Sequence, residues 1–358
     1  MVRRVLRRLA RLLPALLALA LLVWWALRSA DLGRALELVD AQGWRLPLLL
    51  LPNGLVMLAE TAGWRYSFDR IIARPAFRRL LGVRVASEGL MLGLPWGSLV
   101  NDSMQPYLLH ARCGVPLPAA VAAAVARKFF VVVSHGCFLA LATLLCWSTL
   151  DQVSKAAIRH RGLPWFLLAL GIGLVGVSAG AAAVTSRGRV AGRLHHALDR
   201  LGQRWLGSWL ARHAGGFGAA DAALGGFFGD RPAGLLTPLA LYLVGWMVRS
   251  LETLVFLRLV GVEVSLVTAM VMEPAMILLR SAAVPVPAGI GVQDLGYLLF
   301  LKALGVPDWK TAGTAFVVLK RGKDLFWALA GLALLALGRW RHGRQAAGPL
   351  PQGSSRAA

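Results

Sequence analysis

The segments LPWGSLVND (94–102) and VPAGIGVQD (286–294) share the pattern P-x-G-x-x-V-x-D, with the second copy 192 positions after the first. Proline removes a backbone hydrogen-bond donor and glycine loosens a helix, so each motif predicts a break in an otherwise helical segment. The predicted break positions are Pro95, Gly97, Pro287, Gly289 and Gly291. Each motif ends in an acidic residue, Asp102 or Asp294. The chain therefore carries two copies of a helix-breaking, acidic motif.

Further features recur after both motifs in the same order. The tripeptide GVP comes first, and an apolar run with two adjacent cations comes next. These features are GVP at 114–116 and 305–307, followed by Arg127-Lys128 and Lys320-Arg321. A chance match of short motifs in an apolar chain is one interpretation. We favour a duplication, with repeat 1 at about 44–147 and repeat 2 at about 234–337, because the charge pattern below supports it independently.

The composition is that of an integral membrane protein. Hydrophobic residues make up 57% of the 358 residues, charged residues only 16%, and the mean hydropathy is +0.63, outside the usual range of a soluble domain. About 20 apolar residues cross a bilayer as a helix. Seven segments meet this requirement, namely 9–27, 46–64, 118–147, 164–186, 234–258, 264–284 and 311–337. The first can also be interpreted as a signal peptide, but its length and Arg28 favour a retained span. We predict an all-α polytopic membrane protein.

Arginine-rich loops set the predicted topology, because positively charged loops stay cytoplasmic. The N-terminus, a basic loop from Arg65 to Arg84, and the loop 187–231 with its seven arginines are therefore all placed inside. This is possible only if 80–110 enters and leaves the membrane on one side and 264–304 does so from the other. The prediction is about six full spans plus two broken re-entrant hairpins, arranged as an inverted repeat.

The domain organisation follows from this topology. Residues 1–338 form a single integral domain of the inner (cytoplasmic) membrane, in which the span 164–186 links the two repeats. The cytoplasmic loop covers 187–231, and residues 339–358 form a disordered cytoplasmic tail, so both termini are cytoplasmic. The net charge of +22 is concentrated in short loops, which anionic lipid attracts. A nucleic-acid partner is therefore not predicted.

The second motif also carries a family resemblance. The stretch VPAGIGVQDLGYLLFLKALGVP (286–307), followed by LKRGKDLFWALAGL (319–332), resembles the C-terminal signature of the lysylphosphatidylglycerol-synthase transmembrane-region family, whose members are also called flippase-like. Within that family, the chain looks most like the hopanoid-biosynthesis-associated branch. The resemblance extends roughly from the first span to Leu337 and is densest at 273–331.

The resemblance implies a lipid translocase. Many relatives carry a glutamate after the glycines, whereas this chain has Gln293-Asp294, which keeps the carboxylate but moves it by one position. Aminoacyl-lipid synthases of the wider family add a large cytoplasmic acyltransferase-like domain. We expect that domain and the synthase activity to be absent here, so the protein is not predicted to be an enzyme.

Ionisable residues within the predicted spans form the candidate site. Each costs roughly 2.5–3.5 kcal/mol at the bilayer centre and therefore needs a partner or a function. The candidate substrate-binding residues are Glu88, Asp102, Arg249, Glu252, Glu273, Arg280, Asp294 and Lys320. Spacing along a helix predicts the ion pairs Arg249–Glu252 and Lys320–Asp324. It also places Glu273 and Arg280 on one helical face.

The roles of these residues are open to two interpretations. The two predicted pairs either neutralise themselves or line a cavity. For Asp102, Asp294 and Arg280, which flank the breaks, we favour a function, since free helix amides and an arginine suit a phosphate head group. A nearby carboxylate would carry a coupling proton or bind a cationic group. His135 is interpreted as a core histidine in preference to a proton relay.

Three functions are compatible with these features. We favour a translocase that moves a polar-headed lipid, related to hopanoids or phospholipids, between leaflets. The alternative is a non-catalytic membrane partner of a lipid-biosynthesis complex. A membrane-embedded lipid-modifying enzyme is disfavoured, because no Ser/His/Asp set, carboxylate cluster or metal-ligand spacing stands out. No Walker motif is present, so we do not expect the chain itself to use ATP. No cofactor or metal is predicted, and the expected partner is a membrane lipid.

The topology is tested by cysteine labelling. Arg200→Cys, in a chain whose native cysteines Cys113, Cys137 and Cys146 are replaced, should react with a membrane-impermeant maleimide only after the cells are opened, because 187–231 is predicted to be cytoplasmic. Strong labelling of position 200 in intact cells would overturn the topology.

Overall fold

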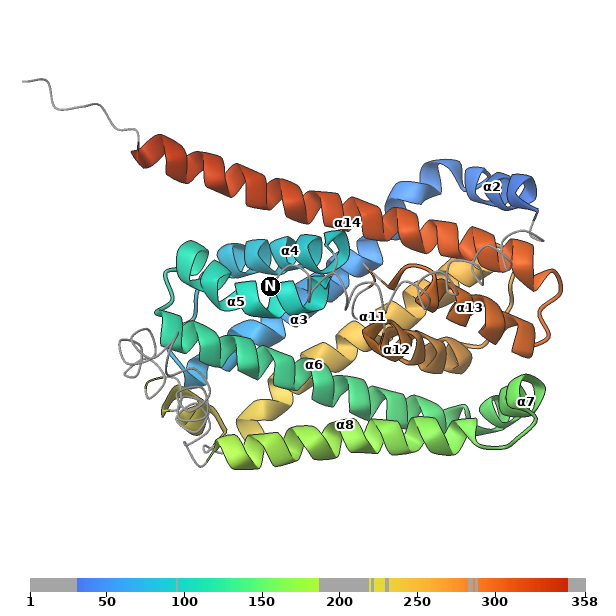
Figure 1. Ribbon diagram of the computed structural model, residues 1–358, viewed down its shortest axis with the longest axis horizontal. Coiled ribbons are helices and arrows are strands. Elements are labelled where there is room, and N and C mark those ends of the chain that lie inside the picture. The colour runs from blue at the N-terminus through green and yellow to red at the C-terminus, as the bar shows by residue number, and fades with distance from the viewer. Residues whose placement is uncertain are drawn as a thin grey trace, which may run out of the picture.

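The computed structural model describes residues 31–94, 96–186, 219, 222–228, 232–282, 286 and 289–346. Every regular element in these ranges is a helix, which confirms the predicted all-α class (Figure 1). In chain order the elements are α2 (Leu32–Asp40), η1 (Gly43–Leu50), α3 (Leu51–Ser67), η2 (Phe68–Arg70), α4 (Phe77–Gly93), α5 (Gly97–Cys113), α6 (Leu117–Leu145), α7 (Trp147–Ile158), α8 (Leu163–Thr185), η3 (Pro232–Leu235), α11 (Leu236–Leu259), α12 (Leu266–Ala282), α13 (Val292–Ala303) and α14 (Trp309–Ala346).

Within the described ranges, four helical segments are long and apolar enough to cross a membrane. They are Gly43–Arg70, which joins η1, α3 and η2, and the helices α6, α8 and α11. These segments match the predicted spans 46–64, 118–147, 164–186 and 234–258. The predicted spans 264–284 and 311–337 coincide with α12 and α14, and the predicted first span, 9–27, lies outside the described residues. The helices are those of a multi-pass membrane protein.

Proline and glycine fix where several helices begin and end. Pro52, Pro118 and Pro164 stand in the first turn of α3, α6 and α8, where a helix does not need the missing N–H. Both GVP motifs follow the second helix of a broken pair, with Gly114 (φ 69°) after α5 and Gly305 (φ 75°) after α13. Glycine adopts this left-handed conformation without strain, and the following proline stops the helix. GVP therefore has the same local role in both halves of the chain.

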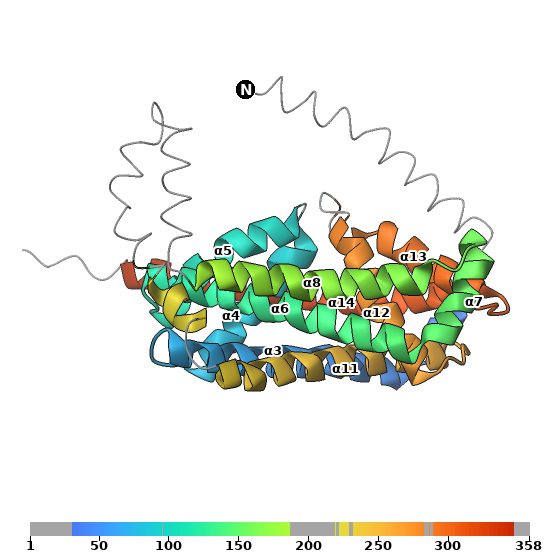
Figure 2. The ribbon, with the colours of Figure 1, turned by 90° about the horizontal axis from the view of Figure 1, so that it is seen from below.

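Both predicted breaks interrupt a helix. α4 ends at Gly93 and α5 begins at Gly97, whereas α12 ends at Ala282 and α13 begins at Val292. Each pair folds back within one half of the bundle, and the helix ends at the two breaks lie near its middle (Figures 1 and 2). The 12 residues of α13 extend about 18 Å, well short of the roughly 30 Å apolar core of a bilayer. Pro95 and Pro287 themselves lie outside the described residues.

The connections between helices divide between the two ends of the bundle. In Figure 1, α2, α7 and the turn between α13 and α14 lie at one end, and the α3–α4 and α5–α6 turns lie at the other. The side on which the cytoplasm lies and the re-entrant course of the broken pairs through the membrane stay predictions. We name the half that holds α4 and α5 the inner half, and the half that holds α12 and α13 the outer half.

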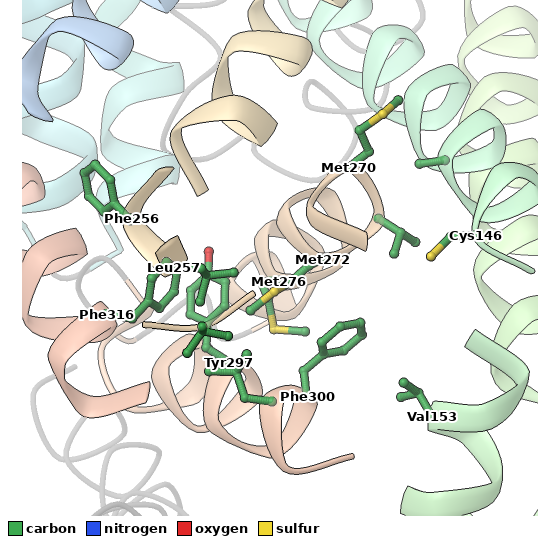
Figure 3. Close-up of a cluster of buried hydrophobic side chains, with 14 of the residues drawn as sticks. Cys146, Val153, Phe256, Leu257, Met270, Met272, Met276, Tyr297, Phe300 and Phe316 are labelled. Carbon is green, nitrogen blue, oxygen red and sulfur yellow. The ribbon is translucent and has the colours of Figure 1, made fainter. Parts of the chain in front are cut away.

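Two apolar cores hold the broken pairs in place. The larger one, in the outer half, packs α13 against α7, α11, α12 and α14 through Val153, Phe256, Met272, Phe300 and Phe316 (Figure 3). The smaller one, in the inner half, gathers buried side chains of α3, α4, α5 and α6. Each broken pair is thus supported by full-length helices.

Helix α14 is longer than the sequence predicted. It continues to Ala346, so residues 339–346 of the predicted disordered tail are helical, because no proline interrupts the chain before Pro349. Residues 347–358 lie outside the described residues.

α14 crosses α4 at two glycines. A Cβ atom on Gly331 would lie 2.4 Å from the carbonyl oxygen of Val85, and one on Gly89 would lie 2.6 Å from the backbone nitrogen of Leu332. Helix backbones approach this closely only where both sides lack a side chain. The crossing therefore fixes the inner broken pair against α14, the longest of the described helices.

Replacing Gly331 with alanine should push α14 away from α4 and lower the free energy of unfolding by about 1–3 kcal/mol, as overpacking does. Gly322→Ala on the same helix is the matched control, because the described residues place no neighbouring atom within 4 Å of its Cβ position and alanine is the better helix former. Thermal unfolding in detergent measures both variants, and equal midpoints would contradict the close crossing.

Candidate functional site

The inner half contains a network of buried ionic residues, centred on Glu60 of α3. The Glu60 carboxylate accepts hydrogen bonds of 2.9 Å from Arg84 of α4 and from Arg249 of α11. Arg84 also lies 2.5 Å from Glu88, one turn further along α4. Arg127 of α6 lies 3.7 Å from the Glu60 carboxylate. Three guanidinium groups thus surround two carboxylates, and the network joins four helices.

The outer half contains a second network, in which two glutamates meet the lysines of α14. Lys320 lies 3.1 Å from Glu252 of α11 and 3.0 Å from Glu273 of α12. Lys323 lies 2.7 Å from Glu252, and the hydroxyl of Tyr297 on α13 donates a 2.9 Å hydrogen bond to Glu273. This network ties the broken pair α12–α13 to the full helices α11 and α14.

The two motif aspartates also have cationic partners. Asp102 lies 2.8 Å from Lys128, and the Asp102 side chain is 39% exposed. Asp294 is 15% exposed and lies 2.6 Å from Arg321, which contacts both carboxylate oxygens. Asp294 also accepts the backbone N–H of Gly291 at 2.9 Å and so caps the N-terminus of α13. The second aspartate is therefore held more tightly than the first.

A cavity of about 460 Å³ is lined by both broken pairs of helices and by α3, α6, α11 and α14. Seven of the eight predicted site residues line it, namely Glu88, Asp102, Arg249, Glu273, Arg280, Asp294 and Lys320. The eighth, Glu252, is buried behind Lys320 and Lys323. Charged residues that are far apart in the sequence are thus brought together around one cavity.

The ion pairs predicted from helical spacing are wrong. Arg249 pairs with Glu60 on α3 instead of Glu252 on its own helix, and Glu252 pairs with Lys320. Asp324 pairs with Arg321 at 3.3 Å instead of with Lys320. Spacing identifies only partners on the same helix, whereas Arg249, Glu252 and Lys320 find closer partners on neighbouring helices. Asp324 does pair within α14, but with Arg321 at i, i+3.

Two members of the inner network were missed or misplaced by the sequence interpretation. Arg84 was assigned to a basic loop, yet it lies in α4 with an exposed fraction of only 3%. Glu60 was not a candidate at all. It is the single acidic residue in the segment 46–64, and an acid alone in an apolar span is itself a signal of a buried partner or a function.

Arg280 differs from the other cations because it forms no ion pair with any described residue, although it lines the cavity. Its aliphatic stem packs against Gly289, where a Cβ atom would lie 2.3 Å from the Cγ of Arg280. Gly289 also has a φ of 63°, so both space and backbone conformation require glycine at this position of the break. Glu273 lines the same cavity but pairs with Lys320.

His135 lines the cavity from a buried, packed position. Its Nε2 atom lies 2.9 Å from the carbonyl oxygen of Pro274, and its ring centroid lies 4.4 Å from that of Trp246. These contacts fit the interpretation as a core histidine. Within the described residues, no group of three His, Cys, Asp or Glu side chains is placed to hold a metal ion.

This arrangement of helices and buried charges lies within a recognised family of membrane regions. The family model of the lysylphosphatidylglycerol synthase TM region matches residues 11–331. The chain belongs to this family. The matched residues include both broken pairs of helices and both ionic networks. No curated protein matches the chain, and the hopanoid-associated branch stays a prediction.

In this lysylphosphatidylglycerol synthase TM region, Glu60→Ala should be strongly destabilising, by about 3–5 kcal/mol, because it leaves three buried guanidinium groups with one carboxylate. Asp69→Asn is the control, since Asp69 pairs with Arg74 at the surface, where both side chains are more than a third exposed and solvent screens the pair. Unfolding in detergent should show a large loss of stability for Glu60→Ala and little for Asp69→Asn. Equal losses would contradict the central role of Glu60.

Proposed function

We propose that the protein is a lipid translocase that moves a polar-headed lipid, related to hopanoids or phospholipids, between the leaflets of the inner membrane. The observation that carries this proposal is the cavity lined by both broken pairs of helices and by ionic side chains. Such a cavity offers polar contacts to a head group inside an otherwise apolar bundle. The acyl chains would remain in the surrounding lipid.

The number of charges around the cavity supports a function over a purely structural role. Removing an ion from water costs several kcal/mol in a protein interior, and apolar residues of similar volume often stabilise a fold as well as or better than a buried ion pair. A bundle that needed only stability would therefore have little use for two ionic networks. A transporter of polar head groups has such a use, because its cavity must replace the hydration of the head group.

The contacts in the two halves support the proposed duplication. Glu60 and Glu252 stand 192 positions apart, as do Asp102 and Asp294. In each half, the first residue of the adjacent cation pair lies near the glutamate and the second lies near the aspartate. We propose that the halves are inverted repeats whose broken pairs are re-entrant hairpins from opposite faces. Inverted repeats with broken helices are a recurring plan of secondary transporters.

A second candidate function is a non-catalytic partner in a lipid-biosynthesis complex. One observation favours it, since Asp294 is engaged in capping α13 and in a bidentate pair with Arg321, which is a structural role. An enzymatic role is not proposed, because the ionic residues are paired with one another instead of surrounding a nucleophile.

The test is lipid translocation in reconstituted vesicles of phosphatidylcholine that contain fluorescent phosphatidylglycerol, with dithionite quenching as the readout. Arg280→Gln should fold normally, since Arg280 has no ion pair among the described residues, but it should lower the translocation rate at least about tenfold, equivalent to roughly 1.4 kcal/mol. Asp294→Asn should also slow translocation, because it loosens the hold on Arg321.

The matched control is Arg258→Gln, which removes one positive charge from the exposed last turn of α11, outside the cavity lining. It should translocate lipid at the wild-type rate. Normal translocation by Arg280→Gln and Asp294→Asn, or none by the wild-type protein, would favour the role of a partner in a complex.

A further inference from the structure

We infer that the inner half of the cavity is a binding site for a phosphate monoanion, formed by Arg127 and the N-terminal end of α5. This inference deepens the proposed function and rests on it for the role of the site in transport. It places the anionic part of the head group in the inner half of the cavity, whereas Arg280 lies in the outer half.

The balance of charges differs between the halves. In the outer half, four cations accompany four carboxylates, namely Lys320, Arg321, Lys323 and Arg280 with Glu252, Glu273, Asp294 and Asp324. In the inner half, four cations accompany three carboxylates, namely Arg84, Arg127, Lys128 and Arg249 with Glu60, Glu88 and Asp102. The inner half therefore has one positive charge in excess. An uncompensated charge is unfavourable in an apolar interior, so this half favours a bound anion.

Arg127 makes the longest ion pair of the inner cations, and its guanidinium group also lies 5.4 Å from the centroid of the Trp64 ring. Its distance from Glu60 is 3.7 Å, whereas Arg84 and Arg249 hold the two oxygens of Glu60 at 2.9 Å each. The Nε atom of Arg127 is buried and has no hydrogen-bond partner among the described residues. The side chain is only 10% exposed and lines the cavity. It is therefore a buried guanidinium group that its long ion pair with Glu60 engages only in part.

The start of α5 is a second and independent reason to place an anion in the inner half. Gly97, Ser98 and Leu99 line the cavity and form the first turn of this 17-residue helix, which has no side-chain cap. The first amides of a helix carry a partial positive charge and bind anions. In the outer half, the start of α13 is already capped by the carboxylate of Asp294. Asp294 also places a negative charge in the first turn of α13, whereas the first turn of α5 has no acidic residue. The inner of these two helix N-termini is therefore the more favourable one for an anion.

The ligand class follows from the charge and the donors. A phosphodiester carries one negative charge, which matches the single excess cation, and its oxygens suit a guanidinium group and backbone amides. The head group of a phospholipid and free inorganic phosphate share this chemistry. The proposed function makes the lipid the expected source.

Calorimetric titration of the purified protein in detergent tests the inference with two probes, dihexanoylphosphatidylglycerol and inorganic phosphate. Arg127→Gln should weaken binding of the lipid at least about tenfold, and Arg127→Lys, which keeps the charge, should weaken it less. Asp102→Asn should tighten binding, because it raises the positive excess of the inner half. Arg258→Gln, outside the cavity, should bind like the wild type.

Binding of the lipid alone identifies a lipid head-group site, and Arg127-dependent binding of both probes identifies a phosphate site open to either source. If Arg127→Gln fails to fold, the two other variants still test the inference, because Arg127→Lys should weaken binding of the lipid and Asp102→Asn should tighten it. Wild-type affinity in Arg127→Gln, or no binding to the folded wild type, would overturn the inference. Translocation is not needed for this measurement, so a protein that binds lipid but does not translocate it would refute only the proposed function.

Discussion

The neutralisation of charge within an apolar bundle is the constraint on which the rest of this structure depends. α11 carries the central pair of residues, Arg249 and Glu252, three positions apart. Arg249 pairs with Glu60 in the inner half, and Glu252 pairs with Lys320 and Lys323 in the outer half. α11 thus joins the two networks, because its arginine pairs with the inner half and its glutamate pairs with the outer half. Exchanging either residue alone would remove one link between α11 and its neighbours, although Glu60 would keep Arg84 and Lys320 would keep Glu273.

The same networks restrict how the broken pairs can move. Arg84 on α4 and Glu273 on α12 belong to broken pairs, whereas their partners Glu60 and Lys320 stand on full helices. A displacement of either pair relative to the full helices would separate charges that are shielded from water. Such a displacement becomes feasible when another ion takes the place of the lost partner. A charged head group in the cavity meets that condition, which links binding to movement in the proposed function.

The sequence predicts the architecture of this protein better than its contacts. Hydropathy located the full helices, and the P-x-G-x-x-V-x-D motifs located both breaks, because proline and glycine act on the backbone of their own segment. The sequence also identified seven of the residues that line the cavity, because a charged residue is conspicuous in an apolar segment. The partners of those charges were not predictable from spacing. Glu60 meets Arg249 across 189 positions, and only the packing of helices decides such a contact.

Local charge density misled the interpretation at one point. Arg84 follows a run of arginines that lie in and near the turn between α3 and α4, and it was counted with them. In the structure it stands about two turns into α4 and is buried. A loop boundary drawn from charge alone extends to the last cation, whereas the true boundary lies where the helix begins. A cation in a loop and a cation in the first turns of a helix differ here only in that the second has a buried acidic partner on another helix. For Arg84 that partner is Glu60.

The two halves share a plan of contacts but differ in how firmly each contact is made. In the outer half, the motif aspartate is held by a bidentate arginine and caps its own helix. In the inner half, the corresponding aspartate faces an exposed lysine, and its helix begins without a cap. If the halves are inverted repeats, exchanging the firm and the loose arrangement between them would place the open helix end at the other break. The second conformation of the protein would then be the present one with the roles of the two halves reversed. A head group would pass between two sites, one in each half, that use the same chemistry.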